Sequence, residues 1–180
     1  MIQRIRTTKH LTILTNDPSI TAWGYAVIRN NEVLSCGCLK TKKSSKKLRI
    51  RVADDDTNRI SEINKILLEI IKRHDVDYIL SELQHGSQNA IAAKWVGATT
   101  AIIITIADVL GIGMESYSEM DSKKALLGKK SATKQETIDA IKNLYTVPWK
   151  NIQYADEAIA DAMSIYYTAL KLSPTLKLLK

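Results

Sequence analysis

Residues 11–19 form an apolar, β-branched run that stops at an acid, a proline and a serine: Leu11-Thr12-Ile13-Leu14-Thr15-Asn16-Asp17-Pro18-Ser19. The run from Leu11 to Leu14 is typical of a strand, and Asp17-Pro18-Ser19 is typical of the turn that ends one. Two more strands follow, Trp23 to Arg29 and Val33 to Leu39, with a tight turn at Asn30-Asn31 between them. The chain is therefore predicted to open with a strand and a β-hairpin.

Beyond the hairpin, helical and extended patterns alternate. The periodicity predicts a helix around Thr57 to Arg73 with Thr57 as its N-cap, and an apolar strand from Val76 to Leu80 that leads into Ser81-Glu82. The remaining expected elements are a long helix from Ser87 to Leu110 ending at Gly111, a strand from Ile112 to Tyr117, and helices at Glu119–Leu127, Thr133–Leu144 and Tyr154–Leu170. This order predicts an α/β fold with a mixed five-stranded sheet and helices on both faces, in one domain spanning 1–180.

The composition favours a soluble, intracellular globular protein. Hydrophobic residues make up 45% of the 180 residues and charged residues 25%, both ordinary values. Met1 to His10 is polar and shows no secretory signal, and no Cys/His set has zinc-ligand spacing. The most apolar stretch, Trp95 to Ile106, is too short to span a bilayer and is interpreted as a buried core helix. No membrane partner is expected.

The charge points towards an anionic partner. The net charge is +7, and the basic residues gather in two clusters. The first contains no acid and consists of Lys40, Lys42, Lys43, Lys46, Lys47, Arg49 and Arg51; the second consists of Lys123, Lys124, Lys129, Lys130 and Lys134. Each cluster alone could be a solvated loop. Together, beside separated acids, they favour contact with nucleic acid phosphates.

The acids are candidates for a metal site. Asp17 and Glu82 each follow an apolar strand, and a later helix carries Asp156, Glu157 and Asp161, with the last two four residues apart. Phosphodiester hydrolysis by two Mg²⁺ ions about 3.5–4 Å apart needs several such carboxylates at one sheet edge. Taken singly, Asp17 could initiate a turn, and Asp156 and Glu157 could complement a helix macrodipole.

Four segments in order resemble the motifs of RuvC-type Holliday junction resolvases, including phage-type members. The first is the Asp17-Pro18-Ser19 strand end followed by Thr21, Gly24 and Tyr25. The others are Leu80-Ser81-Glu82-Leu83-Gln84-His85-Gly86-Ser87-Gln88, then Lys124 to Lys134, then Ile159-Ala160-Asp161-Ala162-Met163-Ser164-Ile165. The resemblance implies an RNase H-like fold and a structure-specific endonuclease that resolves four-way DNA junctions by paired, Mg²⁺-dependent phosphodiester hydrolysis.

The same resemblance assigns residues. It implies that Asp17, Glu82 and Asp161 are metal ligands, and that Lys134 is a catalytic basic residue near the scissile phosphate. The chain departs from the family in two places: Asn16 stands at a usually apolar strand position, and Ala158 stands where many members have Asp or His. We therefore expect Glu157 to be the fourth ligand, with Asp156 as the alternative. The expected DNA-binding residues are Lys42, Lys43, Lys46, Lys47, Arg49, Lys129 and Lys130.

Partners and alternatives follow from these assignments. We expect two Mg²⁺ ions per site, replaceable by Mn²⁺, a branched DNA substrate, no nucleotide cofactor, and a cytoplasmic location in a bacterial or phage-infected cell. A homodimer is expected because a two-fold junction needs two matched nicks, with the helix from Ser87 to Leu110 as the interface unless neighbouring helices cover it. The alternatives are an RNase H-like nuclease without junction preference, or a catalytically silent junction-binding protein.

Overall fold

The structure, a computed structural model, describes residues 11–84, 86 and 88–178. Its centre is a five-stranded sheet with the order β3-β2-β1-β4-β5. Only β2 runs antiparallel to the rest: it pairs antiparallel with both β1 and β3, whereas β4 and β5 run parallel to β1. The strands are β1 (Thr12–Asp17), β2 (Ala22–Arg29), β3 (Glu32–Lys40), β4 (Tyr78–Leu83) and β5 (Gly113–Ser118). The predicted mixed five-stranded sheet is confirmed.

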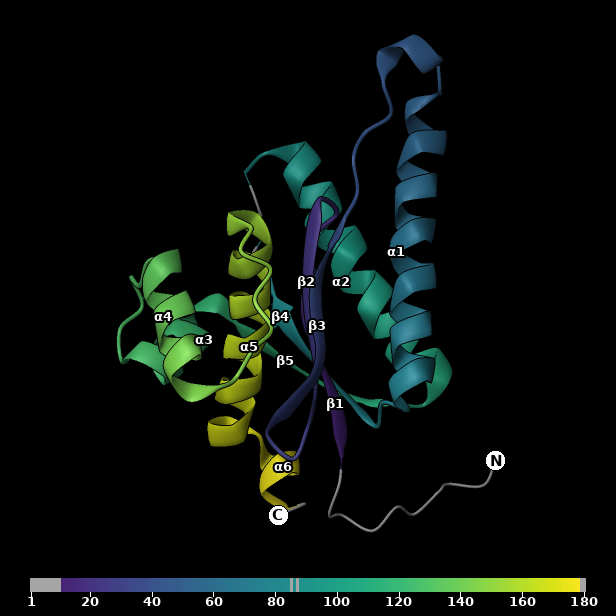
Figure 1. Cartoon of the computed structure of the whole chain (residues 1–180). Helices are drawn as coiled ribbons and strands as arrows, with labels where there is room; N and C mark the ends of the chain where they lie inside the picture. The colour runs from purple at the N-terminus through teal and green to yellow at the C-terminus, as the bar shows by residue number, and fades with distance from the viewer. Residues whose placement is uncertain (1–10, 85, 87, 179–180) are drawn as a thin grey trace.

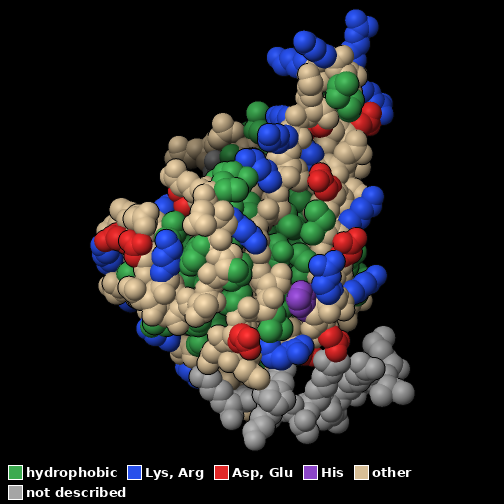
Figure 2. All heavy atoms as spheres, viewed as in Figure 1, with side chains coloured by type: hydrophobic (Ala, Val, Ile, Leu, Met, Phe, Trp, Pro, Cys, Tyr) green, Lys and Arg blue, Asp and Glu red, His purple; other side chains and the backbone are tan. Residues whose placement is uncertain are grey.

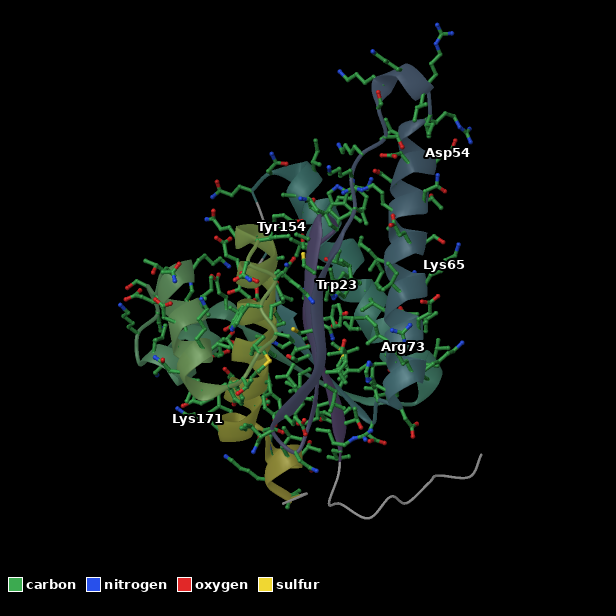
Figure 3. The ribbon with its side chains drawn as sticks, viewed as in Figure 1. Trp23, Asp54, Lys65, Arg73, Tyr154 and Lys171 are labelled. Carbon is green, nitrogen blue, oxygen red and sulfur yellow. The ribbon has the colours of Figure 1, made fainter. Side chains whose placement is uncertain are left out.

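Helices cover both faces of this sheet, as expected (Figure 1). The helices are α1 (Val52–His74), α2 (Ala90–Leu110), α3 (Glu119–Leu127), α4 (Lys134–Leu144), α5 (Gln153–Leu172) and α6 (Pro174–Leu178). The alternation of side chains along β1 divides the core: Ile13 joins an apolar cluster with α5, and Leu14 joins one with α1 and α2. Trp23, fully buried, lies at the centre of the molecule (Figure 3).

The hairpin turn has the backbone that its sequence predicts. Asn30 and Asn31 both have positive φ, 53° and 64°, which a type I′ turn requires and asparagine tolerates. The hairpin is confirmed, and it leads into an exposed basic loop with a short 3₁₀ turn at Lys46–Leu48. Figure 2 shows Lys and Arg side chains gathered on the tip where this loop projects beyond the sheet.

The predicted start of the first helix is wrong. α1 begins at Val52, five residues earlier than expected, and Thr57 is not its N-cap: its hydroxyl donates to the carbonyl of Ala53 inside the helix. The first turns project beyond the sheet and bury little apolar surface, so hydrophobic periodicity does not report them. Asp54 and Asp55 in the first turn favour the helix electrostatically instead.

α2 is far more exposed than a core helix. It begins at Ala90, capped by the side chain of Asn89, whereas the predicted start at Ser87 lies outside the described residues. By length and composition alone it could cross a membrane, although one such helix is weak evidence for a membrane span. Only 22% of its most apolar 18-residue stretch is buried in the protein. Its interpretation as a buried core helix, too short to span a bilayer, is therefore wrong.

Candidate active site

Two predicted acids meet at one edge of the sheet because their strands are parallel neighbours. Asn16 on β1 lies opposite Ser81 on β4, and each is followed directly by an acid, Asp17 and Glu82. On the far side of β4, Leu83 lies opposite Ser118, the last residue of β5. The carboxyl ends of three parallel strands therefore meet at this edge, where α/β proteins build their sites.

Helix α5 brings the third acid to this edge, and one glycine allows its close approach. A Cβ on Gly24 would lie 2.0 Å from the carbonyl oxygen of Ala158, so only glycine lets β2 and α5 pack at this distance. One turn along the helix, the hydroxyl of Thr15 donates to the carbonyl of Ala162 across 2.6 Å. These two contacts fix Asp161 over the end of β1.

The unusual Asn16 also helps to fix the site. It is fully buried, its amide donates to the carbonyl of Leu80 at 3.2 Å, and its oxygen accepts from the indole of Trp23 at 3.1 Å. The side chain thus links three strands directly before Asp17. A polar residue is tolerated at this apolar position because both of its polar ends have partners.

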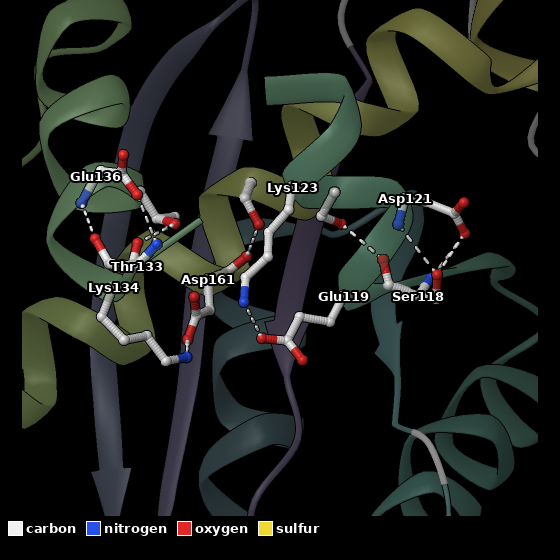
Figure 4. Close-up of polar contacts among 11 residues, drawn as sticks. Ser118, Glu119, Asp121, Lys123, Thr133, Lys134, Glu136 and Asp161 are labelled. Carbon is white, nitrogen blue, oxygen red and sulfur yellow. Dashed lines mark hydrogen bonds and ion pairs between the residues drawn. The ribbon is translucent and has the colours of Figure 1, made fainter. Parts of the chain in front are cut away.

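All five predicted catalytic residues line one cavity of about 340 Å³: Asp17, Glu82, Lys134, Glu157 and Asp161. Glu119, the first residue of α3, lines it too, although the sequence analysis did not select it. Figure 4 shows Lys134 of α4 reaching Asp161 of α5, with Glu119 and Lys123 of α3 beside them. Two strands, β1 and β4, and three helices, α3, α4 and α5, thus contribute charged side chains to one small volume.

Burial and mutual repulsion dominate the electrostatics. Burial, then the charges of Glu82 and Asp161, hold the pKa of Asp17 well above its usual value. Burial, then Asp161 and Glu119, raise the pKa of Glu82 to about 7. No described residue donates a hydrogen bond to the carboxylate of Asp17 or Glu82. The positive charge of Lys134 acts on both carboxylates and that of Lys123 on Glu82, but they do not offset burial and repulsion, so both pKa values stay raised.

Lys134 supplies part of that positive charge. Its ammonium group forms an ion pair and hydrogen bond with one oxygen of Asp161. Burial alone would lower the pKa of Lys134, but the charge and hydrogen bond of Asp161 outweigh burial and raise it. The pKa of Asp161 is still raised, because its own burial outweighs the attraction of Lys134. One lysine does not neutralise this group of acids.

The acidic side chains that line the cavity are of the chemical type that binds a divalent cation. Clustered carboxylate oxygens with little local counter-charge are the ligands that Mg²⁺ prefers. Among residues 11–84, 86 and 88–178, no three acidic, histidine or cysteine side chains already form a group that could hold an ion. Asp161 is turned to Lys134 instead. Binding of an ion therefore needs side-chain rotation at the site, not a different set of residues.

The two candidates for a fourth ligand lie differently. Glu157 lines the cavity, and one of its carboxylate oxygens accepts a hydrogen bond from the side chain of Gln153 at 3.1 Å. Asp156 does not line the cavity; its carboxylate accepts from the backbone N–H of Lys150 at 2.8 Å. Between the two, Glu157 is the residue that faces the acids.

The predicted DNA-binding residues occupy separate places around the site. Lys42 and Lys43 line a second cavity, of about 740 Å³, which shares Ser19 and Gln84 with the acidic one. Lys46, Lys47 and Arg49 are exposed on the projecting loop. On the other side, Lys130 is exposed but Lys129 pairs with Glu136, so its charge is partly used within the protein.

Glu119 is the site residue that sequence reasoning missed. It was read only as the start of a short helix, although it comes two residues after the predicted strand Ile112 to Tyr117, and an acid in the same place after Val76 to Leu80 was the signal that identified Glu82. Applied to the later strand as well, that signal would have found it. Tyr154 also lines the cavity, with the ammonium of Lys40 3.5 Å from its ring centre.

Known proteins match both the sequence and the fold. The family model for the crossover junction endodeoxyribonuclease RuvC matches residues 13–168. The RuvC protein of Shewanella amazonensis is 28% identical over 160 residues, 87% of each chain, and that of Shewanella frigidimarina is 29% identical over the same length.

Solved structures agree in fold. Thermus thermophilus RuvC in complex with a Holliday junction substrate superposes with a TM-score of 0.69 at 23% identity, covering 88% of this chain and 92% of that one. The yeast mitochondrial Holliday junction resolvase gives a TM-score of 0.64 at 14% identity, covering 93% and 81%. These likenesses show the RNase H-like fold, and the family model covers most of the chain. The chain belongs to the RuvC family of crossover junction endodeoxyribonucleases, a family of metal-dependent nucleases.

Proposed function

We propose that this chain is an endonuclease that resolves four-way DNA junctions by metal-dependent phosphodiester hydrolysis. The observation that carries this proposal is the convergence of Asp17, Glu82 and Asp161 at one end of the sheet, where Lys134 pairs with Asp161 in the same cavity. The names of its relatives, crossover junction endodeoxyribonucleases, favour a junction as the substrate. The reaction is carried by a single domain of 1–180.

Each residue has a role in this reaction. Asp17, Glu82 and Asp161 hold the metal, and Lys134 contacts the scissile phosphate once it leaves Asp161. Bound Mg²⁺, two ions per site and replaceable by Mn²⁺, would supply an activated water and stabilise the leaving oxygen. Glu157 is proposed as the fourth ligand, because it lines the cavity and Asp156 does not.

Binding of DNA depends on the basic residues that surround the cavity. Lys42 and Lys43 stand beside the acids and can guide a strand towards them, whereas Lys46, Lys47 and Arg49 on the projecting loop can hold a more distant DNA arm. Lys129 and Lys130 flank the other side of the site. No nucleotide cofactor is required. The bacterial relatives favour action on DNA in the cytoplasm of a bacterial or phage-infected cell.

The working unit is proposed to be a homodimer formed through α2. The helix is apolar, yet its exposed residues include Ile91, Ile104 and Val109. The rest of the chain covers only part of it, at Thr99, Ile103, Ile106 and Ala107. An exposed apolar helix favours an interface. A two-fold dimer offers two equal sites to a two-fold junction.

The test is cleavage of a synthetic four-way junction with Mg²⁺, compared with a linear duplex of the same sequence. Cleavage of the junction alone is expected, and Asp17→Asn, Glu82→Gln and Asp161→Asn should each abolish it while junction binding stays intact, because affinity comes from phosphate contacts. Equal cleavage of both substrates would favour an RNase H-like nuclease without junction preference. Binding without cleavage in any divalent metal would favour a silent junction-binding protein.

A further pair of variants decides the fourth ligand. Glu157→Gln should reduce cleavage strongly, and Asp156→Asn should leave it near normal, since the Asp156 carboxylate serves the backbone of Lys150. An active Glu157→Gln beside an inactive Asp156→Asn would reverse the assignment.

A further inference from the structure

Glu119 stands at the start of α3, directly after the end of β5. The cap of this helix does not depend on it. Ser118 accepts from the backbone N–H of Asp121 at 3.1 Å, and the Asp121 carboxylate accepts from the backbone N–H of Ser118 at 3.3 Å, which completes a capping box. The capping box therefore does not account for where the Glu119 side chain lies.

That side chain faces the acidic site. Glu119 lines the 340 Å³ cavity together with Asp17, Glu82 and Asp161, and it lines a smaller pocket behind it together with Glu82 and Asp161. Figure 4 shows Glu119 and Asp161 reaching the same space from α3 and α5. Its charge is among those that raise the pKa values of all three acids.

A structural role explains this position poorly. Glu119 pairs with Lys123 one turn along, with 2.7 Å between the ammonium and one carboxylate oxygen, and 47% of the Glu119 side chain is exposed. Ion pairs of this spacing on one helix stabilise it only slightly. Against that small gain stands repulsion from three buried or half-buried carboxylates. A bound cation would attract each of these carboxylates and so offset the repulsion among them.

We propose that Glu119 is an additional metal-binding carboxylate, which supplies a ligand from the end of β5 beside those from β1, β4 and α5. The inference rests on the proposed function and deepens it. Under it, the ends of β1, β4 and β5 each contribute one acid, Asp17, Glu82 and Glu119, and α5 contributes Asp161 together with Glu157. Lys123 is the counter-charge of Glu119 in the metal-free protein.

The test measures binding of Mn²⁺ to the full chain without DNA, by the loss of the free-ion electron paramagnetic resonance signal. Glu119→Gln should weaken Mn²⁺ binding by about tenfold or more, and Glu119→Asp should recover part of the loss. Asp121→Asn removes a charge from the same helix turn outside both cavities and should leave binding unchanged. Lys123→Gln should leave it unchanged or tighter, because it removes a competing cation.

Stability provides a second readout. In metal-free protein at pH 8, Glu119→Gln should melt no lower than wild type, because it relieves repulsion, and its Mn²⁺-induced rise in Tm should be smaller. Wild-type affinity in Glu119→Gln, or an equal loss of affinity in Lys123→Gln, would overturn the inference. A lower metal-free Tm with an unchanged Mn²⁺ response would overturn it too, since that is the signature of a merely structural acid.

Asp17→Asn separates the two proposals. If Asp17→Asn no longer binds Mn²⁺ while Glu119→Gln binds it as wild type does, the metal site is supported and the proposed role of Glu119 is refuted. If wild-type protein binds no Mn²⁺, or Asp17→Asn binds it normally, the proposed function falls together with the inference.

Discussion

Gly24→Ala should damage both stability and the site through one contact. The new Cβ would lie 2.0 Å from the Ala158 carbonyl oxygen, and real Cβ atoms essentially never approach closer than 3.0 Å, so α5 must retreat by about 1 Å. Overpacking typically costs about 1–3 kcal/mol, and we expect the upper end because both opposing groups are backbone. The helix that moves carries Asp161, and a displacement of about 1 Å can cost about 100-fold in rate.

Two assays check this prediction. Urea denaturation at constant protein concentration should give a lower midpoint with an unchanged slope, and junction cleavage in Mg²⁺ should fall about 100-fold at temperatures where the variant remains folded. The control is Gly97→Ala, where an added Cβ on α2 meets no atom within 4 Å and the helix gains up to about 1 kcal/mol. A Gly24→Ala protein as stable and active as wild type would refute this account of how α5 is positioned.

Three further predictions concern charge and assembly. Because the folded pKa of Glu82, about 7, exceeds its unfolded value, metal-free wild type should lose stability in melts as pH rises from about 5 to 8; Glu82→Gln and saturating Mg²⁺ should each flatten this dependence. Burial lowers the pKa of His74, so this residue makes stability rise with pH below about pH 6.5. The quantity to measure is therefore the difference in stability between wild type and Glu82→Gln at each pH. In binding titrations, the slope of log binding constant against log salt concentration should become shallower by about one unit per lost phosphate contact when four loop lysines are replaced together. These are Lys42, Lys43, Lys46 and Lys47, and an unchanged slope would show that the loop does not contact DNA. In light scattering at micromolar concentration, wild type should be a dimer and Ile104→Glu a monomer; a wild-type monomer with and without junction would exclude the dimer.

The sequence predicted the centre of the site because strand ends and pairing are local and regular. An apolar run that stops at an acid marks a strand end, and this signal located Asp17 and Glu82. Their adjacency could not be derived from periodicity, since it depends on β1 and β4 being parallel neighbours. The family resemblance supplied that topology, and the structure confirms it.

The errors arose where apolar burial does not govern structure. The first turns of α1 leave the sheet, so the helix starts at Val52 without a hydrophobic signal. α2 is apolar but largely uncovered in one chain, so its pattern resembles that of a core helix. Glu119 was missed because an acid at a helix start has an ordinary explanation in the macrodipole. Only its position beside three other acids distinguishes it.

The charge balance at the cavity implies that metal and DNA bind cooperatively. Five carboxylates line the two adjoining pockets together with only two ammonium groups, those of Lys123 and Lys134; the acids are Asp17, Glu82, Glu119, Glu157 and Asp161. A phosphate brought into this space without added cations would meet net repulsion. Bound cations would neutralise the carboxylates, and Lys134 would then be able to leave Asp161 and contact the phosphate. Under the proposed function, the acids would thus exclude DNA from the reactive position until metal is present, while the exposed lysines of the projecting loop would hold it nearby in either state.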